Sequence, residues 1–326
     1  QAGQQPAQGT GKSGLVDTMP QLEKAPEKPY VRLWVTRDFG TKTMQETVVP
    51  IEPNDTVMDV LKRSVGEVKT SYGGGFVDSI DGLSTGYKSG DANSKKLDWF
   101  YYVNGQIAEV GAAETPVHSG DVVWWDYHNW EYAVHTPALV GAFPHPFVKH
   151  DDQVQNTPII MAIPGFEQQA EELADSLRQV RTEQIKPIPF DEMMFQKEKP
   201  VLLVGDVKSL STSAFLQKLW HEKNTLGLFA EFAQEGIHTY DDNGKMVKTY
   251  SNPGAGVVIS TLHPDTHQPI WMISGTDKAG VEKGVQAVGV TKDWQNELPL
   301  RHFFGLIIDG EQKINLPVIQ SNGAKQ

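Results

Sequence analysis

The 326-residue sequence contains no cysteine. Disulfide bonds, thiolate metal sites and cysteine nucleophiles are therefore all excluded. The sequence also contains no apolar run of the roughly 18–20 residues that cross a bilayer as a helix. A cysteine-free exported protein is common where no disulfide machinery is relied upon, so these absences agree with export from a Gram-positive bacterium.

Basic charge is scarce relative to acidic charge. The chain has 29 Lys and Arg against 41 Asp and Glu, which gives a formal charge of −12. Nucleic-acid binding needs a concentrated basic face, and no cluster of Lys and Arg of that kind is present. We therefore expect an acidic protein with no nucleic-acid partner.

The motifs of common enzyme classes are missing too. The sequence has no GxGxxG or GxxxxGK[ST] nucleotide fingerprint, no GxSxG elbow and no HExxH pattern. His263 and His267 are four residues apart, but Pro264 lies between them and argues against a regular zinc-binding helix. Paired carboxylates such as Glu171-Glu172 are typical of solvated helix faces. The sequence therefore favours a binding protein over an enzyme.

Residues 1–29 open with QAGQQPAQGTGKSG, which has too few apolar side chains to fold. We expect a flexible tether here. Because the chain begins at Gln1, the tether fits a processed surface lipoprotein whose lipid-bearing cysteine would directly precede Gln1. An arbitrary boundary within a linker is the alternative interpretation. The first interpretation predicts an extracellular, lipid-anchored protein at the cell surface.

Residues 30–134 are predicted to form one domain of mixed α and β structure. Apolar and polar residues alternate in its strands, and Val57, Val60, Leu61 and Val65 recur at helical spacing after a capping Asn54 or Asp55. The predicted order is ββαβββ. Its elements are the strands Tyr30–Arg37 and Thr43–Pro50, the helix Thr56–Val65, the strand Phe76–Ile80, a hairpin beginning at Trp99, and the strand Val122–Tyr127.

Residues 135–156 contain Pro137, Pro144 and Pro146 with little periodicity, and we interpret them as a linker or a strap. Residues 157–320 alternate strand and helix patterns, which predicts an α/β domain with a mostly parallel sheet. The predicted strand and helix pairs are Thr157–Ile163 with Gly165–Val180, Pro200–Val204 with Ser211–Glu222, and Pro269–Ile273 with Asp277–Val288. Between them we expect an antiparallel pair, Gly227–Phe232 and Lys245–Tyr250, and a strand, Gly256–Leu262.

The segment Trp99–Tyr127, WFYYVNGQIAEVGAAETPVHSGDVVWWDY, is unusually aromatic. Asn104-Gly105 is the dipeptide that a type I′ hairpin turn favours. Trp124 and Trp125 must point to opposite faces of their strand, so only one of them enters the core of this domain. The other needs a different partner: the second domain, a ligand, or the strap.

The pattern YYVNG…GA…GD.V.W.Y in this segment resembles the small bacterial β-grasp domain related to the C-terminal domain of transcobalamin and intrinsic factor, the animal cobalamin carriers. The resemblance covers about Tyr30–Trp130 and implies a β-grasp fold and cobalamin as the ligand. In the carriers the hairpin after the aromatic strand meets the vitamin, and the matching positions here are Tyr101, Asn104, Gln106, Ala108, Val110 and Ala112.

The same resemblance suggests an adjacent wall for the vitamin. The candidates for this wall are the Gly73–Phe76 loop and Tyr87. Further candidate binding residues are Tyr72, Trp99, His128 and Trp130. Imidazole is a good nitrogen donor for cobalt, so His128 or His135 is a candidate axial ligand. The sequence departs from the carriers in one respect: they clasp cobalamin between an all-helical barrel and the β-domain, and nothing here repeats like a helical barrel.

The resulting prediction is an extracellular protein that binds cobalamin or a related corrinoid and passes it to a membrane transporter. Two alternatives stay open. One is an adhesion or scaffold module of the cell envelope without a small ligand. The other is a corrinoid-processing protein that exchanges an axial ligand.

Overall fold

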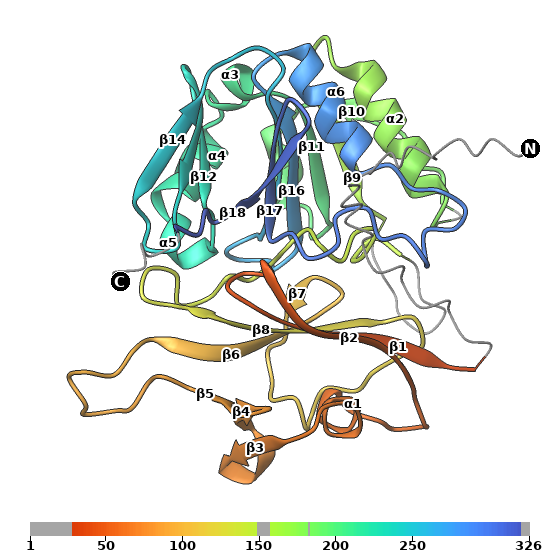
Figure 1. Ribbon diagram of the computed structural model, residues 1–326. Helices are drawn as coiled ribbons and strands as arrows, with labels where there is room; N and C mark the ends of the chain where they lie inside the picture. The colour runs from red at the N-terminus through yellow and green to blue at the C-terminus, as the bar shows by residue number, and fades with distance from the viewer. Residues whose placement is uncertain (1–27, 149–156, 182, 321–326) are drawn as a thin grey trace, which may run out of the picture.

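The computed structural model describes residues 28–148, 157–181 and 183–320. Within these ranges the chain forms both helices and several sheets, so the mixed α and β character predicted from the sequence is confirmed. Figure 1 shows the earlier residues, in red to yellow, below the later residues, in green to blue. No helix in the described ranges is long and apolar enough to span a membrane. The predicted lipid anchor and all but two residues of the tether lie outside the described residues.

The lower part contains a five-stranded sheet in the order β2-β1-β8-β6-β7. Strands β1 and β8 pair in parallel, and every other neighbouring pair is antiparallel. Asn104 and Gly105 both have positive φ at the β6–β7 turn, as a type I′ turn requires. The strands are β1 (Tyr30–Arg37), β2 (Lys42–Pro50), β6 (Leu97–Val103), β7 (Gln106–Ile107) and β8 (Val122–Asn129).

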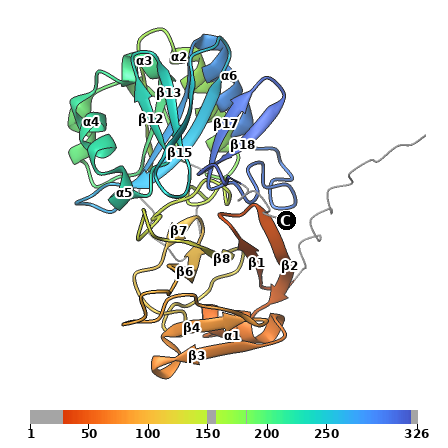
Figure 2. The same cartoon turned by 60° about the vertical axis from the view of Figure 1, so that its left-hand side comes forward.

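A helix and a small sheet cover one face of these strands (Figure 2). Helix α1 (Val57–Ser64) begins at Thr56, whose side chain accepts from the Asp59 N–H while the Asp59 carboxylate accepts from the Thr56 N–H. The small sheet consists of β3 (Val68–Ser71), β4 (Phe76–Ile80) and β5 (Leu83–Ser84), with a short 3₁₀ turn, η1 (Tyr72–Gly74), between β3 and β4. Strands β3 and β5 were not predicted, because they are short and carry no alternating apolar pattern.

The upper part contains a seven-stranded sheet in the order β10-β9-β11-β16-β15-β17-β18. Its first three strand pairs are parallel and its last three are antiparallel, so the prediction of a mostly parallel sheet was wrong. The reason is that a short turn joins β15 directly to β16, and such a turn can only join antiparallel neighbours. The strands are β9 (Ile159–Ala162), β10 (Ile188–Pro189), β11 (Val201–Asp206), β15 (Gly256–Leu262), β16 (Pro269–Gly275), β17 (Gly305–Asp309) and β18 (Gln312–Leu316).

A separate three-stranded sheet has the order β12-β13-β14 (Ala230–Ala233, Gly236–Tyr240 and Met246–Tyr250). The sequence predicted direct pairing of the outer two strands, but β13 lies between them. Gly236 makes this possible, because its φ of +145° and its closeness to the Tyr250 carbonyl leave no room for a side chain. The helices of the upper part are α2 (Glu167–Arg178), η2 (Glu192–Gln196), α3 (Val207–Leu210), α4 (Ala214–His221), α5 (Lys223–Leu226) and α6 (Lys278–Ala287).

The junction between the two parts explains the excess of aromatic residues. Trp125 belongs to the lower core with α1, whereas Trp124 belongs to a larger core shared with the upper part. The two side chains therefore do separate as strand alternation predicts. Trp124 packs edge-on against Trp34 and Phe304, at centroid distances of 5.3 and 5.2 Å. The strap also contributes buried side chains to this core, namely Leu139, Val140, Phe143 and Phe147.

Candidate functional site

Two loops far apart in sequence meet at the side of the lower part: residues 72–76 and residues 108–115. The backbones approach closely, because a Cβ added to Gly111 would lie 3.2 Å from both the Cα and the carbonyl oxygen of Gly75. This approach favours glycine at position 111, since a side chain there would push the two segments apart.

Hydrogen bonds attach the second loop to helix α1 and to β6. The backbone N–H groups of Val57 and Met58 donate to the carbonyls of Thr115 and Ala112, at 2.9 and 3.0 Å. The Tyr101 hydroxyl donates to the Val110 carbonyl and lies 2.8 Å from the Thr115 hydroxyl. Burial raises the pKa of Tyr101, so the phenol keeps the proton that it donates. The loop is thus held at several points along its length.

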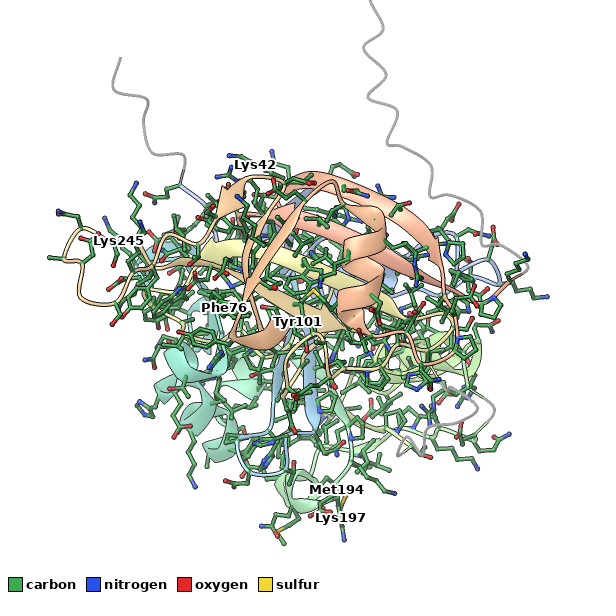
Figure 3. All side chains as sticks on the ribbon, turned by 90° about the horizontal axis from the view of Figure 1, so that it is seen from below. Lys42, Phe76, Tyr101, Met194, Lys197 and Lys245 are labelled. Atoms are coloured by element: carbon green, nitrogen blue, oxygen red, sulfur yellow. The ribbon has the colours of Figure 1, made fainter. Side chains whose placement is uncertain are left out.

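The two loops expose apolar side chains. Tyr72 is 91% exposed, Val110 49% and Phe76 37%. Ala113 is also exposed, and its Cβ would lie 3.8 Å from a Cβ added to Gly74. We call this set, Tyr72, Phe76, Val110 and Ala113, the tip surface. Figure 3 labels Phe76 and Tyr101 in the view of the molecule from below. Exposed apolar groups gathered in this way are typical of a binding surface.

One turn of the upper part lies beside the second loop, residues 108–115. His267, in the turn between β15 and β16, is 3.7 Å from the Glu109 carboxylate. Both side chains are largely exposed, so the ion pair adds little stability. The contact nevertheless places the β15–β16 turn next to the tip surface.

Several residues predicted for the site have structural roles instead. Trp99 is buried and donates from Nε1 to the Leu83 carbonyl at 2.8 Å. Asn104 donates to Asp121 and accepts from the Val122 N–H, which fixes the hairpin turn. Ala112 is buried against α1, and Gln106 forms a bridge to Ala138 of the strap. The structure thus does not place these four side chains on the tip surface, whereas Ala108 is half-buried within the second loop.

Tyr87 and Trp130 form a different aromatic pair. Their ring centroids are 5.2 Å apart, and Lys96 lies over the Trp130 ring. The backbone N–H of Trp130 donates to the Lys96 carbonyl just before β6 begins, whereas Tyr101 lies toward the other end of β6. Strand rise puts the two places roughly 15 Å apart. The structure therefore does not bring Tyr87 and Trp130 to the tip surface.

The two candidate cobalt ligands, His128 and His135, also lie outside the tip surface. His128 is 1% exposed and stacks between Phe39 and Phe100, at centroid distances of 4.3 and 4.5 Å. Its Nδ1 is 2.7 Å from the Asp126 carboxylate. Neighbouring side chains therefore enclose the His128 ring, and the structure does not bring this candidate ligand to the tip surface. His135 is exposed and its backbone lies near Gly227, in the upper part. Within the described ranges no group of three or more His, Asp or Glu side chains could hold a metal ion.

Sequence reasoning missed a second feature, a cavity of about 650 Å³ in the upper part. It lies between η2, α4 and the β15–β16 turn. No sequence signal could have identified it, because its walls come from three segments separated by tens of residues. Its principal lining residues are Glu192, Phe195, Phe215, Lys218, Glu222, His263 and Asp265.

Comparisons with known proteins place only part of the chain. A family model described as a domain of unknown function (DUF4430) matches residues 54–129, which include both loops of the tip surface. No curated protein matches the chain. Among solved structures, a protein from Ruminococcus gnavus described as a "putative metal binding protein" is 18% identical, with a TM-score of 0.23. The match covers 31% of this chain and 96% of that protein. The similarity in structure is too low to carry an argument about fold or function.

Proposed function

We propose that this chain is an extracellular, cell-surface protein that binds cobalamin or a related corrinoid through the tip surface. The observation that carries the proposal is the meeting of residues 72–76 with residues 108–115. The second of these loops contains three of the six positions that resemble the vitamin-contacting hairpin of the cobalamin carriers, namely Ala108, Val110 and Ala112. The first loop supplies the two exposed aromatic rings beside it.

We further propose that residues 30–134 form a β-grasp domain. The central parallel pair of β1 and β8, with antiparallel strands on both sides and α1 packed on one face, supports this assignment. In such a domain the tip surface lies on loops held by a rigid sheet and helix. Binding residues are commonly placed in this way.

The chemistry of a corrinoid fits these loops. The corrin ring presents a broad, partly apolar face, and its rim carries amide groups that donate and accept hydrogen bonds. Tyr72, Phe76 and Val110 offer apolar contact, while Gly73 and Gly75 expose backbone to the rim amides. In this proposal the β15–β16 turn borders the bound ligand, and a membrane transporter receives it.

The test is a spectrophotometric titration of the full chain with cobalamin, followed by desalting. We expect a red complex of one corrinoid per chain. The double variant Tyr72→Ala/Phe76→Ala should weaken binding by about tenfold or more, because it removes both exposed rings. Tyr87→Ala is the matched control, since it removes an exposed aromatic ring from the other aromatic pair.

Four outcomes would contradict the proposal. One is the absence of binding at micromolar cobalamin, and another is equal binding by the double variant. A protein that stays colourless but binds a peptide, a glycan or an envelope protein would instead be an adhesion or scaffold module. A change in the cobalamin spectrum beyond that of simple binding would identify a corrinoid-processing protein.

A further inference from the structure

The cavity in the upper part has an aromatic wall. Phe195 and Phe215 stack with a centroid distance of 4.0 Å, and His263 stacks on Phe215 at 5.3 Å. Leu219 and the exposed Met193 extend this wall. Its volume of about 650 Å³ is suited to a small organic ligand, because such sites commonly measure about 300–1,000 Å³.

His263 presents one defined hydrogen-bond donor to this cavity. Its Nδ1 accepts from the backbone N–H groups of Asp265 and Thr266, at 3.0 and 3.2 Å. These two bonds require the neutral ring to carry its proton on Nε2. Burial lowers the pKa of His263, which keeps the ring neutral. The side chain is 9% exposed, and its Nε2 has no hydrogen-bond partner among the described residues.

The charged groups of the cavity are mostly acidic. Three carboxylates line it, those of Glu192, Glu222 and Asp265, and Lys218 is the one ammonium group among the lining residues. Glu192 already accepts from the Ser213 hydroxyl and from the Phe215 N–H, which fixes it at the start of α4. Glu222 and Asp265 have exposed side chains that are free to meet a ligand. The lining therefore favours a positive ligand over a negative one.

We propose that this cavity binds an amphiphilic organic cation, that is, an apolar ring or chain carrying one ammonium group. The apolar part packs against Phe215 and Leu219. The ammonium group lies near Glu222 and Asp265, and the His263 Nε2–H donates to an acceptor atom or to the π face of the ligand. Lys218 opposes the cation and so limits its affinity.

The first experiment compares three probes that share an indole ring and differ in charge: tryptamine, tryptophol and indole-3-acetate. Isothermal titration calorimetry of the full chain should show binding of tryptamine. Neutral tryptophol should bind about tenfold more weakly, because it has no charge for the carboxylates to attract. Indole-3-acetate should bind more weakly still, because the carboxylates repel its negative charge. Tighter binding of indole-3-acetate than of tryptamine, or no binding of any probe, would overturn the proposal.

Single substitutions test the roles of Glu222 and Lys218 in binding the cation. Glu222→Gln should weaken tryptamine binding severalfold, and Lys218→Gln should strengthen it, because they remove an attractive and a repulsive charge. Both side chains are exposed, so these variants should fold normally. Glu311→Gln makes the same charge change in the exposed β17–β18 turn and should leave tryptamine binding unchanged. Weaker binding by Lys218→Gln would show that Lys218 attracts the ligand, which contradicts the proposal.

This site is independent of the tip surface. Tyr72, Phe76, Val110 and Ala113 do not line the cavity, whose walls come from η2, α4 and the β15–β16 turn. Tyr72→Ala/Phe76→Ala should therefore retain tryptamine binding, whatever its effect on cobalamin. Loss of tryptamine binding in that double variant would contradict a separate site.

Discussion

His302 shows the effect of burial on a single titratable side chain at the junction. Its ring packs against Trp34 at a centroid distance of 4.8 Å, and its Nδ1 is 3.1 Å from the Thr43 hydroxyl. Burial and the neighbouring Arg301 lower the pKa of His302 to about 3. The Glu46 carboxylate, 3.7 Å from Nε2, would favour the charged ring, but burial outweighs it and raises the pKa of Glu46 as well.

This pKa predicts a pH dependence of stability. The unfolded chain protonates His302 near its ordinary pKa of 6.5, whereas the folded chain protonates it only near 3. Between these values the unfolded state holds the extra proton, so stability falls as the pH falls. The contribution of this residue is about 1.4 kcal/mol per pH unit. His302→Gln should reduce the slope of unfolding free energy against pH in urea titrations, and an unchanged slope would contradict this assignment.

At the scale of elements, the strap depends on one glycine. Gly141 is buried under β8, where an added Cβ would lie 2.6 Å from the Trp124 ring and 2.7 Å from the Phe303 carbonyl oxygen. The strap can therefore pass between β8 and the upper part only without a side chain at this position.

We expect Gly141→Ala to destabilise the protein by about 1–3 kcal/mol, the usual cost of overpacking a core. The measurement is the free energy of unfolding in urea. Trp124→Phe supplies a second test, because a smaller ring leaves room for the methyl group. The two substitutions together should cost less than the sum of their separate effects. Strict additivity would show that Gly141 and Trp124 do not constrain each other.

At the scale of the whole molecule, the larger hydrophobic core joins both parts of the chain. Phe39 of the lower part packs against Phe229 and Phe304 of the upper part, at centroid distances of 5.6 and 5.4 Å. The backbone after β1 is fixed to the same junction, because the Asp126 carboxylate accepts from the N–H groups of Phe39 and Gly40. The two parts therefore share this larger core, beside the separate core that the lower part forms with α1.

This shared core predicts cooperative unfolding. The full chain should unfold in urea in one transition, seen at the same midpoint by tryptophan fluorescence and by circular dichroism. A fragment of residues 28–134 should unfold at a lower urea concentration and bind an apolar dye, because it exposes the face that carries Trp34 and Trp124. A fragment as stable as the full chain would show that the two parts are independent.

Local patterns predicted the elements with strong periodicity. Strand Tyr30–Arg37 and strand Phe76–Ile80 have the predicted bounds, and the predicted helix over Thr56–Val65 differs from α1 by one residue at each end. The patterns did not predict β13 or the antiparallel half of the large sheet, because strand order depends on pairing between distant segments. At the candidate site, exposed Tyr72, Phe76 and Val110 were among the predicted residues, but so were the enclosed Trp99 and His128.

The sequence by itself determined the strands and helices with strong periodicity, that Trp124 and Trp125 face opposite ways, and that thiol chemistry is absent. These properties follow from residue type and from the repeat of side chains along one strand or helix. Only the tertiary structure decided that Trp124 is covered by Phe304, that residues 72–76 meet residues 108–115, and that Phe215 and His263 line one cavity. Such contacts join residues far apart in the chain, and they depend on how the sheets pack against each other.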